Sequence, residues 1–146
     1  MTTHGTEDFA TAVAEVGRAA GAFAGGDETP YTSRWAHGPD VTIYGAWGDH
    51  EHGWDEVGPR LRWAAERFVP GGRTEQEILA MGSSGDLGYT VALERGHVHV
   101  VGRADAAPML LRVTHVYRRI DGVWRIVHRH ADPIAAKTPA ATVLTP

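Results

Sequence analysis

The chain has 146 residues, a formal net charge of −4 at pH 7 and no cysteine, so it has the size of one domain without disulfides, thiol nucleophiles or Cys-ligated metals. The negative net charge excludes nucleic-acid binding through a basic surface. The sequence has no apolar run long enough for a membrane-spanning helix, which excludes insertion into a membrane by such a helix. The N-terminal segment lacks the basic and apolar regions of a secretory signal, which predicts a cytoplasmic protein, and the lysine-poor composition is typical of a bacterial source.

The first half of the chain predicts helices. Apolar residues recur at helical spacing from Phe9 to Phe23, after a candidate cap at Thr6. Residues 27–35 predict a short second helix or a turn. A third helix is predicted from Trp54 or Asp55 to Phe68, where a Pro-Gly-Gly sequence follows it.

The other segments predict strands. Residues 40–47 form one strand before the third helix, and 77–81 form a short strand after it. Residues 87–94 and 97–103 read as a hairpin around Arg95-Gly96. Helices segregated to one side of an antiparallel sheet predict an α+β fold, with one domain over residues 1–133 and an extended C-terminal arm over 134–146.

The last predicted hairpin is the most informative stretch. Asp121-Gly122 lies between two β-branched runs and suits a type I′ turn, which requires positive φ at both central residues. A two-residue loop pairs Ile120 with Val123 and brings His115 opposite His128, whereas a three-residue loop would shift the register by one residue. Because side chains alternate between faces, one face of the two-residue register carries Leu111, Val113, His115, Tyr117, Trp124, Ile126, His128, His130 and Asp132. Apolar bulk with a few convergent polar groups is typical of a ligand pocket.

Four segments of the chain resemble the NTF2-like superfamily, and within it the SnoaL-like and DUF4440-like branch. These segments are 40–45 (DVTIYG), 53–57 (GWDEV), 111–119 (LRVTHVYRR) and 124–133 (WRIVHRHADP), so that the resemblance covers about residues 7–133. It implies a cone in which a strongly bent antiparallel sheet wraps around N-terminal helices and encloses a pocket. It also implies a homodimer formed through the outer face of the sheet.

The members of this superfamily, as the resemblance implies, include ketosteroid isomerases, scytalone dehydratase, polyketide cyclases, limonene epoxide hydrolases and association domains. The chain departs from the ketosteroid isomerases, because Gly45 stands where their catalytic Asp is expected and the first helix has no tyrosine. It is similar to scytalone dehydratase in its inventory of tyrosines and histidines. SnoaL-type cyclases use an acid on a late strand, where Asp132 or His130 stands in this sequence.

Four residues are predicted to be catalytic, namely His128, His130, Asp132 and Tyr44. Histidine titrates near neutral pH and can give or take a proton, so His128 and His130 would form an acid/base pair beside His115. Asp132 would orient His130, and Tyr44 would polarise a substrate oxygen. The alternative is that these groups form a buried network that anchors the last strand.

Further residues are predicted to line the pocket, namely Tyr31, Trp35, Trp47, Trp54, His115 and Tyr117. The loop 49–52 (DHEH) offers ligand types that suit zinc or iron, but a solvated rim or lid loop is favoured, and no metal is predicted. The opposite strand face carries Arg112, Arg118, Arg125 and Arg129. These arginines need acidic partners, for which Glu75, Glu77, Glu94 or a second subunit are available.

Phosphate-binding loops, nucleophile elbows and dinucleotide fingerprints are missing from the sequence, so no cofactor is predicted. The sequence favours a general acid/base enzyme, of the dehydratase, isomerase or cyclase type, that acts on a small apolar, cyclic or aromatic carbonyl compound. The alternative is a non-catalytic module that binds a small molecule or dimerises. A metal-dependent enzyme is a third, minor alternative.

Overall fold

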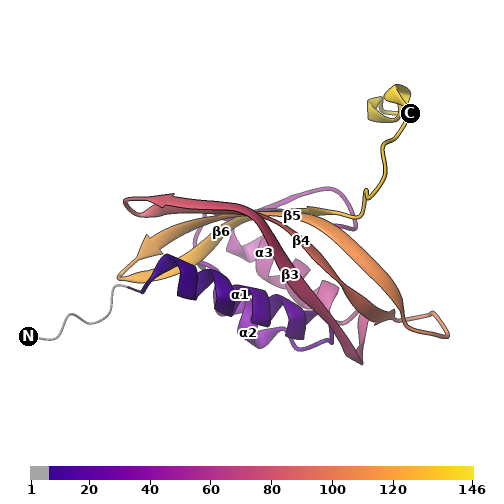
Figure 1. Cartoon of the computed structure of the whole chain (residues 1–146), viewed down its shortest axis with the longest axis horizontal. Helices are drawn as coiled ribbons and strands as arrows, with labels where there is room; N and C mark the ends of the chain where they lie inside the picture. Colours follow the sequence, from indigo (N-terminus) through magenta and orange to yellow (C-terminus); the bar gives the residue numbers. More distant parts are fainter. Residues whose placement is uncertain (1–6) are drawn as a thin grey trace, which may run out of the picture.

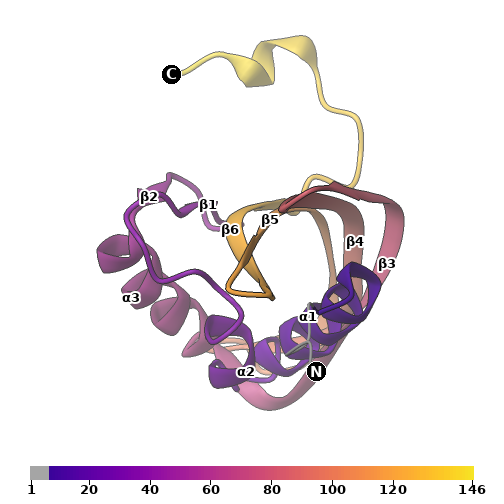
Figure 2. The same ribbon diagram turned by 90° about the vertical axis from the view of Figure 1, so that its left-hand side faces the viewer.

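The computed structural model describes residues 7–146. Its helices are α1 (Phe9–Phe23), α2 (Thr29–Thr32) and α3 (Trp54–Ala65), and its strands are β1 (Thr42–Tyr44), β2 (Glu51–His52), β3 (Phe68–Ser84), β4 (Leu87–Val100), β5 (Ala107–Ile120) and β6 (Val123–Asp132). The sheet arches over the helices (Figure 1), and the view along the arch shows it curled around α1 and α2 (Figure 2). The predicted α+β cone is therefore confirmed.

The strands form one six-stranded sheet in the order β2-β1-β6-β5-β4-β3. Strands β3 to β6 pair antiparallel with their neighbours in sequence. Strand β1 instead lies parallel to β6, with Thr42 beside His128 and Tyr44 beside His130. The sheet is thus mixed, and the prediction of a purely antiparallel sheet is wrong in this respect. The parallel pair brings the loop after β1 next to the end of the last strand.

Helix α1 packs against the concave face of the sheet. The Asp8 side chain caps it by accepting a hydrogen bond from the backbone N–H of Thr11 at 3.1 Å, which satisfies a free donor of the first turn; the cap predicted at Thr6 lies outside the described residues. Phe9 contacts Tyr117 of β5 edge to face, with ring centroids 5.3 Å apart. The apolar stripe of the helix is thereby buried against the sheet, as its periodicity predicts.

The hairpin predicted around Arg95-Gly96 is wrong, because β4 runs without interruption from Leu87 to Val100. A Cβ atom on Gly96 would collide with the backbone carbonyl of Arg73 on β3. The glycine therefore marks a close approach of two strands near an irregularity in their pairing, and not a turn. Strand β3 is likewise much longer than the predicted segment 77–81.

The turn of the last hairpin is as predicted. Asp121 and Gly122 have φ values of 52° and 79°, as a type I′ turn requires. Ile120 pairs with Val123, and Tyr117 pairs with Ile126. The two-residue loop is therefore confirmed at the turn end of the hairpin.

Beyond Ile126 the register is shifted by a β-bulge. Val127 is an extra residue between the pairs Tyr117–Ile126 and Val116–His128. The predicted pairings of His115 with His128, of Val113 with His130 and of Leu111 with Asp132 are therefore wrong. The observed pairs are His115–Arg129, Thr114–His130, Val113–Ala131 and Arg112–Asp132. One inserted residue exchanges the two faces of the strand, so Arg129 lies on the inner face and His128, His130 and Asp132 lie on the outer one.

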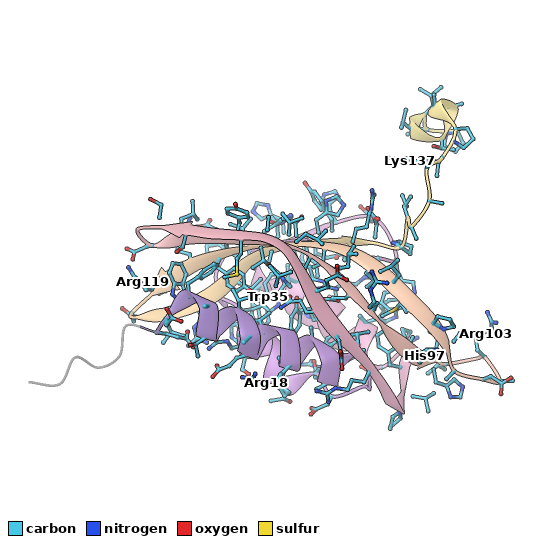
Figure 3. All side chains as sticks on the ribbon, in the orientation of Figure 1. Arg18, Trp35, His97, Arg103, Arg119 and Lys137 are labelled. Atoms are coloured by element: carbon cyan, nitrogen blue, oxygen red, sulfur yellow. The ribbon has the colours of Figure 1, made fainter. Side chains whose placement is uncertain are left out.

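The tail after β6 leaves the body of the molecule and contains one turn of 3₁₀ helix, Ala140–Val143 (Figure 1). Lys137 lies on this tail, whereas Trp35 lies inside the body between helices and sheet (Figure 3). Within residues 7–146, no helix combines the length and the apolar character that crossing a bilayer requires.

Candidate functional site

A cavity of about 230 Å³ lies between the helices and the inner face of the sheet. Most of its lining is apolar and comes from α1, α3 and the sheet, with Ala20, Phe23, Leu61, Phe68 and Leu111 among the lining side chains. The polar side chains that line it are Tyr31, Arg60, Thr74, Glu94 and Arg129. Tyr31 and Glu94 are almost completely buried, whereas Trp47 and Pro133 are exposed, so the cavity has a buried end and an open end.

An ion pair stands at the buried end. Arg129 of β6 donates from Nη1 to Glu94 Oε2 and from Nη2 to Glu94 Oε1, both at 2.9 Å, so the contact is bidentate. Glu94 comes from the inner face of β4 and Arg129 is turned inward by the bulge at Val127. Two parallel charge-assisted hydrogen bonds fix the plane of the guanidinium.

Tyr31 and His115 form a second buried pair beside it. The Tyr31 hydroxyl oxygen lies 2.6 Å from His115 Nε2, and Arg129 Nη1 lies 3.4 Å from the same oxygen. Tyr31 is held in place by the turn of α2, and its ring contacts Phe23 with centroids 5.4 Å apart. His115 is completely buried on β5 and pairs in register with Arg129.

The environment fixes the charge of each group. Burial raises the pKa of Tyr31 to about 12, and burial followed by the charge of Arg129 lowers the pKa of His115 to about 3. Burial alone would raise the pKa of Glu94, but the charge and hydrogen bonds of Arg129 outweigh it and hold this pKa below its usual value. At neutral pH the site therefore holds one cation, one anion, a neutral imidazole and a neutral phenol.

The hydrogen bonds leave donors for a ligand. His115 Nδ1 is buried without a partner in the part of the chain that the structure describes. If the proton of His115 is on Nε2, Nδ1 carries a lone pair without a partner. This costs less than a buried N–H without an acceptor. In that tautomer the Tyr31 oxygen accepts from His115, and its own proton is free to point into the cavity. Arg129 carries five N–H donors, and Glu94 accepts from only two of its nitrogens.

The predicted ligand-binding residues divide into two groups. Tyr31 and Trp47 line the cavity. Trp35, Trp54, His115 and Tyr117 do not line it. Trp35 and Tyr117 belong to the buried core, while Trp54 stacks on His37 with centroids 3.9 Å apart.

The four residues that were predicted to be catalytic lie together on the outer face of the sheet, away from the cavity. The Tyr44 ring contacts His128 and His130 edge to face, with centroid distances of 5.1 and 5.2 Å. The bulge puts His128, His130 and Asp132 on the outer face, and Tyr44 lies beside His130 on the neighbouring strand β1, so the prediction that they face the cone is wrong. Asp132 is engaged by Arg112 in a bidentate contact with both distances 2.7 Å, and the hydrogen bonds from Arg112 lower its pKa.

The loop 49–52 was the candidate for a metal site. In residues 7–146, no group of three or more acidic or histidine side chains has an arrangement that could hold a metal ion. Asp49 instead contacts the His50 imidazole, with Oδ1 3.0 Å from Nδ1. The loop Gly48–Asp49, with φ values of 97° and 57°, turns the chain between β1 and β2 at the rim of the cone.

Sequence reasoning missed Arg129 and Arg60 as lining residues. It grouped Arg129 with the solvent-side arginines because strict alternation along β6 puts it there. Glu94 was among the acids predicted to pair with these arginines, and its pairing with Arg129 confirms that part. The sequence signal that could have identified Arg129 was Glu94, an acidic residue on a strand whose other inner residues are small or apolar. Such a buried carboxylate requires a cationic partner.

The neutral state of His115 gives the fold a pH dependence. Its pKa of about 3 lies below the usual value of 6.5, so between these values the unfolded chain binds a proton that the folded chain does not. Its contribution to stability is therefore complete above pH 6.5 and is lost as the pH falls. We expect the wild type to lose about 2 kcal/mol of unfolding free energy through this group between about pH 7 and pH 5. Urea unfolding of wild type and His115→Gln at both pH values measures it; the variant should lose less stability on acidification, and an equal loss would contradict the assignment.

Comparisons with known proteins agree with the fold. The model of the SnoaL-like domain family matches residues 14–136. An NTF2-like superfamily protein from Salmonella enterica serovar Typhimurium has 18% identity and a TM-score of 0.70, over 88% of this chain and 92% of that chain. A candidate dehydratase of the NTF2-like family from Streptomyces avermitilis has 18% identity and a TM-score of 0.67, over 86% and 94% of the two chains.

A third similar structure, a candidate calcium/calmodulin-dependent protein kinase II association domain from Xanthomonas campestris, has 13% identity and a TM-score of 0.64, over 80% of each chain. A search of curated proteins finds no match. The solved structures share the fold at these low identities, while the family model covers most of the chain, including the segments that build the cavity. The chain belongs to the SnoaL-like domain family.

Proposed function

We propose that the cone binds a small, mostly apolar carbonyl compound whose oxygen accepts hydrogen bonds from Tyr31 and Arg129. The observation that carries this proposal is the position of the Tyr31 hydroxyl and the Arg129 guanidinium, side by side at the buried end of a mostly apolar cavity. Such a combination of apolar walls and a few convergent polar groups is typical of small-molecule sites. Arg129 is held by Glu94 and Tyr31 by His115, so both donors are oriented before a ligand arrives.

The size of the cavity restricts the ligand. An apolar protein cavity of roughly 150 Å³ accommodates benzene. A cavity of about 230 Å³ therefore has room for a substituted single ring or a small fused pair. The charges restrict it further: Arg129 and Glu94 cancel each other, so the group bound at the buried end is a neutral oxygen and not an anion.

A titration with acetophenone, a ring-sized ketone, tests this proposal. We expect a dissociation constant on the order of 1 mM, from about 0.5 kcal/mol per non-hydrogen atom. Ala20→Phe places a ring where the cavity is lined by a small side chain, and it should weaken binding at least about tenfold. Ala14→Phe, on the exposed side of the same helix, is the matched control and should leave binding unchanged. Ligand-observed NMR measures the three affinities. Equal binding by the wild type and both variants would refute a site in the cone.

A second candidate function is cofactor-independent acid/base turnover of the bound carbonyl compound. It is favoured by Glu94, the carboxylate that lines the cavity beside the two donors. Glu94 would accept a proton from the carbon next to the carbonyl, the electron pair would move to the oxygen, and Tyr31 and Arg129 would stabilise the enolate. Return of the proton at another carbon is an isomerisation, and loss of a β-hydroxyl group as water is a dehydration. The similarity to a candidate dehydratase supports this reading.

We also propose that two copies of the chain pack through the outer face of the sheet. A band without acidic or arginine side chains crosses four strands there, made of Tyr44, Tyr89, Val91, Thr114, Val116, His128 and His130. Tyr44 and Tyr89 are 46% and 45% exposed, which is high for large aromatic side chains in a single copy. Sedimentation should give the mass of a dimer for the wild type and of a monomer for Tyr89→Glu, in which each copy would bury a charge. A monomeric wild type would refute the proposal.

A further inference from the structure

The open end of the cavity carries a cation that the proposed carbonyl site does not use. Arg60 lies on α3, next to the lining residue Leu61 and one turn before Ala64, and its side chain is half-buried. Its guanidinium lies over the ring of Trp63, with Cζ 3.9 Å from the ring centroid. Stacking on an aromatic face holds an arginine in place while leaving its N–H groups at the edge free to bind.

No acidic side chain neutralises Arg60 within residues 7–146. It takes part in none of the ion pairs or side-chain hydrogen bonds of the described chain, in contrast to Arg34, Arg112 and Arg129. Glu56, four residues earlier on the same helix, instead accepts the backbone N–H of His52 at 3.0 Å. The other arginine near Trp63, Arg67, lies over the same ring at 4.9 Å and adds positive charge.

The charge of the cavity is therefore uneven along its length. Arg129 and Glu94 cancel at the buried end, while Arg60 leaves one unbalanced positive charge at the open end, where Trp47 and Pro133 are exposed. A guanidinium matches a carboxylate in shape and charge, because two parallel N–H groups can bind its two oxygens. The apolar walls between both ends suit the ring of a ligand.

We infer that the ligand of the cone is a ring-sized keto acid, with its carbonyl oxygen at Tyr31 and Arg129 and its carboxylate on Arg60 at the open end. The inference rests on the proposed function, because it takes the same cavity and the same carbonyl site. It adds a chemical class, small aromatic or cyclic carboxylates, and a residue that selects them.

Three probes separate the two claims, namely acetophenone, para-acetylbenzoate and methyl para-acetylbenzoate. The last two differ only in the group proposed to contact Arg60, which is a charged carboxylate in one and a neutral ester in the other. We expect the wild type to bind the carboxylate at least about tenfold more tightly than the methyl ester, as one charge-assisted hydrogen-bonded pair provides. This preference should decrease with added salt, because the site is partly open to solvent.

Arg60→Gln should abolish the preference for the carboxylate over its methyl ester, because the charge that selects the carboxylate is removed. The matched control is Arg62→Gln, which removes the same charge from the same helix at an exposed position. It should keep the full preference, which separates direct binding from general attraction. Isothermal titration with each probe gives the three affinities.

Three results would overturn the inference. If the wild type binds acetophenone but does not prefer the carboxylate, the role of Arg60 is refuted and the proposed carbonyl site is not affected. The same holds if the preference for the carboxylate persists in Arg60→Gln. A wild type that binds none of the three probes refutes the inference together with the proposed function.

Discussion

Glu94→Gln should lower the free energy of unfolding by about 3–5 kcal/mol, which is the usual cost of removing one partner of a buried ion pair. Glu94 is 3% exposed and accepts hydrogen bonds from both terminal nitrogens of Arg129. Glutamine keeps the size of the side chain but removes the negative charge, so the Arg129 cation stays in the interior without a counter-ion. Urea unfolding at neutral pH measures the loss.

A double substitution shows where this loss comes from. Glu94→Gln with Arg129→Met removes both charges, and an apolar replacement of a buried pair is often close to neutral. The double variant should therefore be more stable than Glu94→Gln alone. A single variant that loses less than about 1 kcal/mol, the range of exposed ion pairs, would contradict a buried pair at this site.

Tyr31→Phe should slow the enolisation of a bound ketone by about 100-fold, because removing one donor to a developing oxyanion typically costs that much. The measurable reaction is exchange of the acetyl protons of acetophenone for deuterium in D₂O, followed by NMR at saturating ketone. Phenylalanine keeps the ring and its edge contact with Phe23, so the packing of α2 is retained. The variant should still bind acetophenone, with a few-fold weaker affinity for the loss of one hydrogen bond.

Tyr44→Phe is the matched control for this experiment. Tyr44 was the tyrosine that the sequence predicted to polarise a substrate oxygen, but it lies on the outer face of the sheet, 46% exposed. Its loss should leave the exchange rate unchanged. If Tyr44→Phe slows exchange and Tyr31→Phe does not, the outer-face cluster is the active one. If the wild type binds the ketone without exchanging its protons faster than buffer does, the cone is a binding module.

Much of the fold could be predicted from local signals. The type I′ turn at Asp121-Gly122 needs only two residues that tolerate positive φ, and it fixes the first pairs of the hairpin. The apolar stripe from Phe9 and the glycine-rich stop after α1 likewise act over a few residues. Such features are independent of distant contacts, and the structure agrees with them.

The face of the strand on which each residue lies could not be predicted beyond Ile126. The bulge at Val127 has no local sequence signal, since valine is an ordinary strand residue. What favours the bulge is long-range: it brings Arg129 to Glu94 of β4 and puts Ala131, not a histidine, against the inner face of the sheet. The close approach at Gly96 could not be predicted for a similar reason, because its neighbour Arg73 is distant in sequence.

An X-ray structure of the chain with bound acetophenone would show where the ketone binds. We expect Arg129 on the inner face in contact with Glu94, with the ketone in the cone and its oxygen within hydrogen-bonding distance of the Tyr31 hydroxyl. An Arg129 side chain on the outer face, with His128 and His130 turned into the cone, would contradict this expectation and restore the histidines as the catalytic candidates.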